Sequence, residues 1–270
     1  MILYPNCKIN IGLNVVERRA DGYHNIETVF FPVPYTDILQ IEKEKSDFCF
    51  SIFGNKIKGN IENNLVIKAL RLLQNDFSIP PLNIQLTKKI PTGAGLGGGS
   101  ADGAFMLKGL NDLLNLQISD EKLEFYASQL GADCSFFVRN KTVFAQGTGN
   151  VFFPVSLSLQ GYYIVIVKSD INVSTAEAYA AITPKKPEIS LPKAICEPVE
   201  KWKELIFNDF EKTVFAKLPQ IAAIKQQLYD CGAIYAAMSG SGSAVYGIFD
   251  KKINSPENIF KGYFFTHAIF

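Results

Sequence analysis

The sequence has few cysteines and no long apolar run, and each absence excludes a class of protein. Five cysteines among 270 residues are odd in number and form no C-x-x-C pair, which argues against a disulfide framework or a zinc site. Reduced thiols fit this usage best. The longest apolar runs, such as 162–167, fall far short of the ~20 residues needed to cross a bilayer. We therefore expect a cytoplasmic protein with no membrane segment.

Clustered positive charge is also absent. The chain has 27 basic and 26 acidic residues, and the basic ones are dispersed, whereas a duplex nucleic-acid partner needs a basic face. Two common phosphate loops are missing too. No lysine lies between Lys89 and Lys108, which excludes G-x-x-x-x-G-K-[ST], and the glycine run is too dense and too late for the dinucleotide fingerprint. We expect a small-molecule partner, no nucleic acid, and a monomer or weak homodimer.

What is present is a glycine-rich stretch in the middle of the chain. Five of the seven residues from 93 to 99 are glycine, after an alternating segment at 82–86 typical of a strand and before a segment typical of a helix. A glycine loop at a helix start is a phosphate site, because first-turn N–H groups lack intrahelical partners. The alternative is a flexible turn with a helix cap, but the glycine density and the Ser100 hydroxyl favour phosphate. The expected ATP-binding residues are Pro91, Thr92, Gly93, Ala94, Gly95, Leu96, Gly97, Gly98, Gly99, Ser100 and Ala101.

The rest of the chain mixes strands and helices without a strict βαβ period, which predicts an α+β fold. Strands are expected at 8–16, 26–33, 37–42 and 48–53, with Pro34 as a break, and helices at 64–77 and 119–131, the latter ending at Gly131 as its C′ residue. A Ser/Leu stretch without charge at 154–161 predicts a domain boundary, dividing 1–156 from 157–270. The second part is expected to have a helix at 174–182, an extended loop at 184–198, helices at 200–207 and 210–231 with an interruption at Pro219, and strands at 162–168, 233–238, 244–249 and 263–270.

Three elements carry a family resemblance: Lys8-Ile9-Asn10, the glycine loop, and Met238 to Ala244. Together they resemble the motifs of the small-molecule kinases that include galactokinase, homoserine kinase, mevalonate kinase and phosphomevalonate kinase. Two further segments, 19–24 (Arg-Ala-Asp-Gly-Tyr-His) and 131–133 (Gly-Ala-Asp), resemble those members that act on 4-diphosphocytidyl-2-C-methyl-D-erythritol. The resemblance spans almost the whole chain, in order. It implies a two-domain fold, with a first domain like ribosomal protein S5 domain 2 and a ferredoxin-like second domain.

The resemblance also implies a reaction and its residues. ATP would phosphorylate the 2-hydroxyl of the cytidine-diphosphate substrate, in non-mevalonate isoprenoid biosynthesis, with Mg²⁺ on the phosphates and Ser100 as its candidate ligand. Asp133 would be the catalytic base and Lys8 its partner, which is sensible because an attacking hydroxyl needs a proton acceptor. The alternatives are that Asp133 is a helix N-cap and that Lys8 is a solvated strand residue. At Ser135 the chain departs from the family, which commonly has proline there.

By the same resemblance, the cytidine pocket comprises Tyr23, His24 and Tyr179, because aromatic faces can sandwich a pyrimidine. Asn10 would bind the polyol end of the substrate. The alternatives are that Tyr23 and His24 merely follow a turn and that Tyr179 packs its own helix; for Tyr179 the two interpretations have nearly equal weight.

Other functions stay open at this point. Another kinase of the family, of the mevalonate or homoserine type, is the nearest. A non-catalytic RNA-binding module is possible because the first-domain fold also occurs in ribosomal proteins, although the balanced charge weighs against it. A nucleotide-sensing regulator would bind ATP without producing ADP.

Overall fold

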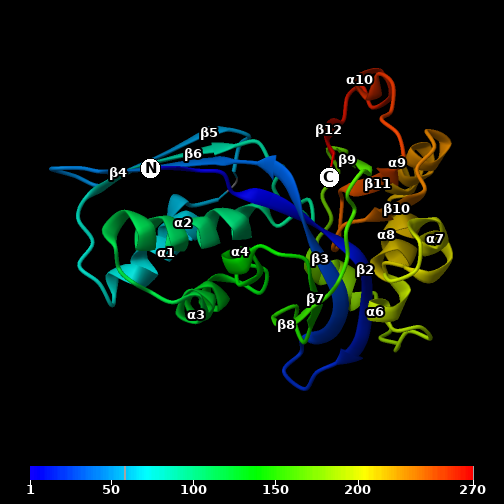
Figure 1. Ribbon diagram of the computed structural model, residues 1–270, viewed down its shortest axis with the longest axis horizontal. Helices are drawn as coiled ribbons and strands as arrows, with labels where there is room; N and C mark the ends of the chain where they lie inside the picture. Colours follow the sequence, from blue (N-terminus) through cyan, green and yellow to red (C-terminus); the bar gives the residue numbers. More distant parts are fainter. Residues whose placement is uncertain (58, 270) are drawn as a thin grey trace. The chain divides into compact units, whose positions relative to one another are not determined.

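The structure is a computed structural model that describes residues 1–57 and 59–269 (Figure 1). The chain forms two compact units, each assembled from segments that are separate in sequence. The first unit comprises Met1–Cys7, Pro34–Thr92 and Gly97–Lys141, and the second comprises Lys8–Val33, Gly93–Leu96 and Thr142–Phe270. The division of 1–156 from 157–270 stays a prediction.

The first unit is a four-stranded sheet covered by helices. The strand order is β1-β4-β6-β5, with β5 parallel to β6 and the other pairs antiparallel. Along β6, buried and partly exposed residues alternate, and its buried Leu82, Ile84 and Leu86 join the core beneath α1, α2 and α3. Figure 1 shows these helices on one face of the sheet. The elements of this unit are β1 (Ile2–Leu3), β4 (Ile38–Lys43), β5 (Cys49–Gly54), η1 (Ile61–Asn63), α1 (Leu65–Gln74), β6 (Leu82–Lys88), α2 (Gly98–Leu114), α3 (Asp120–Leu130) and α4 (Phe136–Arg139).

The second unit contains two four-stranded sheets. One has the order β2-β3-β7-β8, and the other has the order β10-β11-β9-β12 with antiparallel pairs throughout. If the four strands of this second sheet are numbered along the chain, their spatial order is 2-3-1-4, which is the arrangement of a βαββαβ ferredoxin-like unit. The long strands β2 (Asn6–Arg18) and β3 (His24–Thr36) contribute to both units. The other elements of the second unit are β7 (Val143–Gln146), β8 (Val151–Pro154), β9 (Tyr163–Lys168), α5 (Thr175–Ala180), α6 (Leu191–Ala194), η2 (Val199–Lys201), α7 (Trp202–Leu205), α8 (Phe210–Lys217), α9 (Pro219–Asp230), β10 (Tyr235–Met238), β11 (Val245–Phe249), α10 (Pro256–Ile259) and β12 (Phe264–Ile269).

Local sequence signals explain several helix boundaries. The side chains of Asn64, Ser119 and Ser174 each accept a hydrogen bond from a first-turn amide of α1, α3 and α5. Pro219 begins α9 and separates it from α8, as its fixed φ and missing N–H predict. The predicted helices and most predicted strands are therefore confirmed. Within the described residues, no helix is both long and apolar enough to cross a membrane.

Four local predictions need correction. β3 continues through Pro34 to Thr36, so this proline lies within a strand and does not end it. The segment 184–198 is not wholly extended, because α6 forms inside it with Pro192 in its first turn. Gly131 follows α3, but its φ of 167° is extended backbone and not a left-handed cap. The final strand begins at Phe264 instead of residue 263, and Phe270 lies outside the described residues.

Candidate active site

Three sequence motifs that lie far apart in the chain meet within the second unit. The Lys8 amide donates a hydrogen bond to the carbonyl of Leu96 (2.9 Å), which joins the first motif to the glycine loop. The Ser239 hydroxyl donates to the carbonyl of Gly95 (2.9 Å) and accepts from the amide of Asn10 (3.2 Å). One buried serine of the third motif therefore connects the other two.

The close approach at Gly95 requires glycine. Its φ is +77°, and a Cβ there would lie 2.0 Å from the carbonyl oxygen of Ser239. The adjacent carbonyl of Ala94 accepts a hydrogen bond from the amide of Ala244 (3.1 Å), at the far end of the third motif. The tip of the glycine loop is thus fixed by backbone contacts, which contradicts the alternative that it is a flexible turn.

Lys8 is buried on β2, with only 3% of its surface exposed. Its ammonium donates to Oδ1 of Asn10 (2.6 Å) and lies 4.8 Å from the ring centroid of Phe30, a cation–π distance. Asn10 in turn donates from Nδ2 to the Thr28 hydroxyl (2.9 Å), which donates to the carbonyl of Gly12 (2.6 Å). The alternative that Lys8 is a solvated strand residue is wrong, because a buried network fixes its side chain.

In the first unit, the glycine loop leads into the N-terminus of α2. Gly97 is the N-cap residue in a left-handed conformation (φ 70°), and no side-chain hydrogen bond caps the helix there. Ser100 is the third helical residue, and the first turn contains no acidic residue. Uncapped amides at the positive end of a 17-residue helix suit an anion such as a phosphate.

Asp133 lies in the turn between α3 and α4, and its residue surface is half-buried. The N-cap residue of α4 is Ser135, whose hydroxyl donates to the carbonyl of Glu124 (3.1 Å). Burial raises the pKa of the neighbouring Cys134 thiol to about 12; a hydrogen bond with Ser100 acts against this shift, and the charge of Asp133 adds to it. These effects place Asp133, Cys134 and Ser100 in one neighbourhood of the first unit.

Two of the three aromatic residues expected at a cytidine pocket stack in the second unit. The rings of His24 and Tyr179 have centroids 5.0 Å apart and planes 23° from parallel, and Phe210 packs edge-on against Tyr179 at 4.8 Å. Tyr23 is 67% exposed, and its amide donates to Oδ1 of Asp21 (3.0 Å) in the preceding turn. The structure therefore brings His24 and Tyr179 together.

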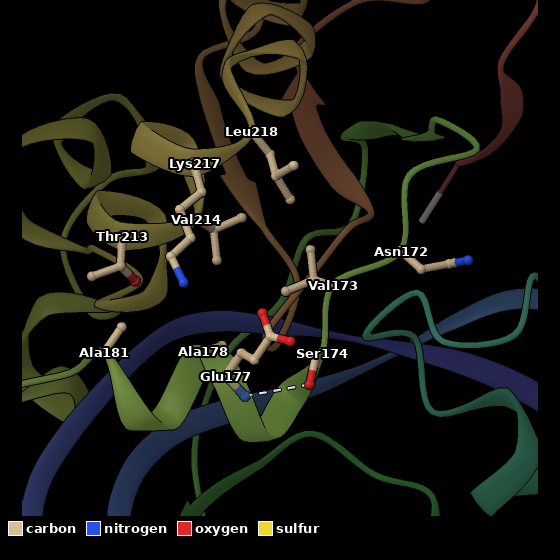
Figure 2. A pocket seen from close by; sticks show the side chains of 10 residues that line it. All are labelled: Asn172, Val173, Ser174, Glu177, Ala178, Ala181, Thr213, Val214, Lys217 and Leu218. Atoms are coloured by element: carbon tan, nitrogen blue, oxygen red, sulfur yellow. Dashed lines mark hydrogen bonds between the residues drawn. The ribbon is translucent and has the colours of Figure 1, made fainter.

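Helices α5 and α8, which carry Tyr179 and Phe210, also border a cavity of about 170 Å³. Figure 2 shows Val173, Val214 and Leu218 along its apolar side, and the side chains of Glu177 and Lys217 reaching into it from α5 and α8. Ser174 holds the first turn of α5 through a hydrogen bond from the Glu177 amide (3.3 Å). The cavity lies beside the helix that positions Tyr179, but Tyr179 does not line it.

The described residues contain no group of three or more His, Cys, Asp or Glu side chains that would hold a metal ion. The Ser100 hydroxyl in the first turn of α2 is compatible with Mg²⁺, which takes most of its ligands from phosphate oxygens and water when it binds with a nucleotide. The residues present therefore fit a metal that arrives with ATP.

Sequence reasoning missed two groups of residues. Thr28 and Tyr246 support Asn10, the latter by donating its hydroxyl to the Asn10 carbonyl (2.9 Å), and no motif or spacing marks either residue. Asp102 and Asp37 are the second group: both carboxylates are buried against the Lys88 ammonium. A buried lysine with two carboxylates has no local sequence signature when its members come from three separate elements.

Comparison with known proteins identifies the family of this chain. Residues 64–141 match the GHMP kinases N-terminal domain, and residues 193–257 match the GHMP kinases C-terminal domain. A mevalonate kinase structure from Methanococcus jannaschii superposes with a TM-score of 0.70 at 16% identity, covering 99% of this chain and 97% of that one, which shows the shared fold. The chain belongs to the GHMP kinase family.

Several relatives define the branch of the family. A 4-diphosphocytidyl-2-C-methyl-D-erythritol kinase from Bacteroides fragilis is 56% identical over 252 residues, covering 92% of each chain. That from Parabacteroides distasonis is 56% identical over 257 residues, covering 95% of this chain and 94% of the relative. A crystal structure of 4-(cytidine 5'-diphospho)-2C-methyl-D-erythritol kinase has a TM-score of 0.77 at 30% identity, covering 92% of this chain and 90% of that one. At this identity and coverage, the branch is that of the 4-diphosphocytidyl-2-C-methyl-D-erythritol kinases.

Proposed function

We propose that this protein transfers the γ-phosphoryl group of ATP to the 2-hydroxyl of 4-diphosphocytidyl-2-C-methyl-D-erythritol, a step of non-mevalonate isoprenoid biosynthesis. The observation that carries the proposal is the 56% identity to kinases of that name over 92% of the chain. The convergence of Lys8, Gly95 and Ser239 supports it, because the motifs of the resemblance contact one another in the folded protein.

In the proposed reaction Asp133 accepts the proton of the attacking hydroxyl. The hydroxyl oxygen forms a bond to the γ-phosphorus while the bond from that phosphorus to the β,γ-bridging oxygen breaks, so ADP leaves directly and no phosphoenzyme forms. Lys8, held by Asn10, steers the hydroxyl and stabilises negative charge.

The glycine loop and the start of α2 are the proposed ATP site. The uncapped amides of Gly98, Gly99 and Ser100 would donate to phosphate oxygens at the positive end of the helix. Ser100 would hold Mg²⁺, which when bound offsets charge on the phosphates. The absence of acidic residues from the first turn supports this location, because a carboxylate there would repel the triphosphate.

The proposed cytidine pocket uses the stacked pair of His24 and Tyr179, with the exposed ring of Tyr23 available as a further stacking face. Asn10 is proposed to bind the polyol end. Its Oδ1 already accepts from Lys8 and its Nδ2 donates to Thr28, so its second role is to fix the direction of the lysine ammonium. We further propose that the protein is cytoplasmic and that it is a monomer or weak homodimer. Light scattering of the purified protein tests the oligomeric state.

The test is an assay of ADP release by the purified protein with four acceptors supplied separately: the cytidine-diphosphate substrate, mevalonate, homoserine and galactose. The expected result is turnover with the first and background rates with the others. Equal or greater activity on mevalonate would overturn the choice of substrate. ATP binding with no ADP release on any acceptor would favour a nucleotide-sensing regulator instead.

A further inference from the structure

A buried charged cluster in the first unit joins the residues that precede the glycine loop to those that follow it. Lys88, the last residue of β6, donates to the Asp37 carboxylate and to Oδ2 of Asp102 (2.7 Å). The three side chains are 1%, 0% and 3% exposed. One lysine is therefore shared by two carboxylates from two other parts of the unit: the turn between β3 and β4, and the second turn of α2.

The first carboxylate of this cluster holds the chain that enters the loop. Oδ1 of Asp37 accepts from the backbone amides of Lys89 (2.6 Å) and Ile90 (2.8 Å), the two residues that precede Pro91. Its other oxygen receives the Lys88 ammonium. Asp37 therefore holds residues 88–90 through two backbone amides and one side-chain ammonium.

The second carboxylate holds the chain that leaves the loop. Asp102 lies one turn into α2, so its contact with Lys88 connects the end of β6 to the beginning of the helix. The ammonium also lies close to the helix start, because a Cβ on Gly98 would be 3.4 Å from Nζ of Lys88 and 2.7 Å from Cγ2 of Ile90. One ammonium group thus lies against both flanks of the glycine loop.

The energetics favour a positioning role over a simple stabilising one. Burial alone would lower the pKa of Lys88, but the charges of Asp102 and Asp37 outweigh burial and raise it, so the lysine is charged. Removing one partner from a buried charged cluster is strongly destabilising, whereas replacing such clusters by apolar residues is often neutral or stabilising. The presence of a buried charged cluster is therefore weak evidence that its role is to stabilise the fold. In addition, Oδ1 of Asp102 has no hydrogen-bond partner among the described residues.

We propose that Lys88, bound between Asp37 and Asp102, is a positioning residue for ATP: it sets the distance between the two flanks of the glycine loop, so that the first-turn amides of α2 face the triphosphate. The inference rests on the proposed kinase function but adds three residues outside the loop itself. It assigns them no contact with the nucleotide. Their effect is on ATP affinity and not on the proton transfer or on the acceptor.

The test compares Lys88→Met, Asp37→Asn and Asp102→Asn with Tyr126→Phe. Tyr126 is a matched control because it is also buried in the first unit and bonds a carboxylate, Asp76, on a part of the core that does not hold the loop. Circular dichroism and thermal unfolding establish that each variant is folded. Calorimetry then measures the affinity for a non-hydrolysable ATP analogue. The Michaelis constants for ATP and for the cytidine substrate show whether a variant affects the binding of one substrate or of both.

We expect Lys88→Met and Asp37→Asn to weaken ATP-analogue binding at least tenfold while the Michaelis constant for the acceptor changes less than twofold. Asp102 accepts through one oxygen only, so Asp102→Asn can keep that acceptor and is expected to fall within threefold of wild type. Asp37 accepts through both oxygens, so Asp37→Asn loses one of its acceptors. Tyr126→Phe is expected to lower thermal stability without changing ATP affinity.

Wild-type ATP affinity in a folded Lys88→Met or Asp37→Asn variant would overturn the proposal, as would an equal loss of affinity for both substrates. If Lys88→Met does not fold, the comparison of Asp37→Asn with Asp102→Asn decides. Because the calorimetry needs no turnover, a wild-type protein that binds the analogue but phosphorylates no acceptor would refute the kinase function and leave this test intact.

Discussion

The backbone amide of Lys8 donates a hydrogen bond to the carbonyl of Leu96, so the proposed catalytic lysine and the tip of the glycine loop are neighbours although 88 positions separate them in the sequence. The Lys8 side chain is oriented separately, through Asn10 and Thr28. The backbone and the side chain of Lys8 are thus fixed by different partners, so the position of the ammonium is set before any substrate binds.

Replacement of Gly95 tests whether the loop tip depends on the close approach to Ser239. Gly95→Ala places a Cβ 2.0 Å from a backbone oxygen at positive φ, so the free energy of unfolding should fall by about 1–3 kcal/mol. Gly99→Ala is the matched control for stability, because a Cβ there meets nothing within 4 Å. Thermal unfolding of both variants checks this. Equal stability of the two would show that the loop relaxes freely.

Asp133→Asn tests the proposed base. An amide cannot accept the hydroxyl proton, so kcat should fall by a factor of about 10²–10⁴, while affinity for an ATP analogue stays within about twofold. Rapid-quench measurement of product and calorimetry with the analogue separate the two effects. A variant with a near wild-type rate removes Asp133 as the base. A variant that also loses ATP binding would assign it a role in the nucleotide site instead.

Removal of either stacked ring tests the cytidine pocket. Tyr179→Ala and His24→Ala each remove one face of the pair, so the Michaelis constant for the acceptor should rise roughly tenfold or more, because stacking on a base contributes ~1–3 kcal/mol. The constant for ATP should not change. Tyr263→Ala, which removes a partly exposed ring elsewhere in the second unit, serves as the control. An unchanged acceptor constant in both ring variants would mean that the pair only packs α5.

The cysteines should differ in reactivity. Cys49 and Cys196 are exposed, whereas Cys7 and Cys134 are buried, and burial raises the pKa of Cys134 to about 12. A raised pKa leaves little thiolate at pH 8, so Cys134 should resist iodoacetamide while Cys49 and Cys196 react. Mass spectrometry of digested, labelled protein measures each site. Early labelling of Cys134 in folded protein would show that the turn carrying Asp133 opens.

Periodicity and turn residues predicted most of the fold, because strands and helices leave local signals. The alternation in β6 and the cap residues Asn64 and Ser119 are examples. Pro34 misled the prediction because only tertiary pairing decides whether β3 tolerates a proline. The five cysteines, expected to be reduced, are all free thiols.

The candidate site was predictable where its residues belong to motifs and unpredictable where they support those motifs. Lys8, Gly95 and Ser239 were recognisable, and their contacts follow from the fold. Lys88 and Asp37 were not, since burial and partnership are properties of the folded chain. The glycine residues of the loop predict that some backbone group packs closely against it. Only the structure identifies that group as the Ser239 carbonyl, which lies against Gly95.

The most direct test of the central claim, that Asp133 and Lys8 act together on one hydroxyl, is a double-mutant cycle on kcat. Asp133→Asn, Lys8→Met and the double variant are compared with wild type at saturating ATP and acceptor. The account predicts a large loss in each single variant and little further loss in the double variant, because each residue depends on the other. Independent, multiplicative losses, or a single variant with wild-type turnover, would contradict it.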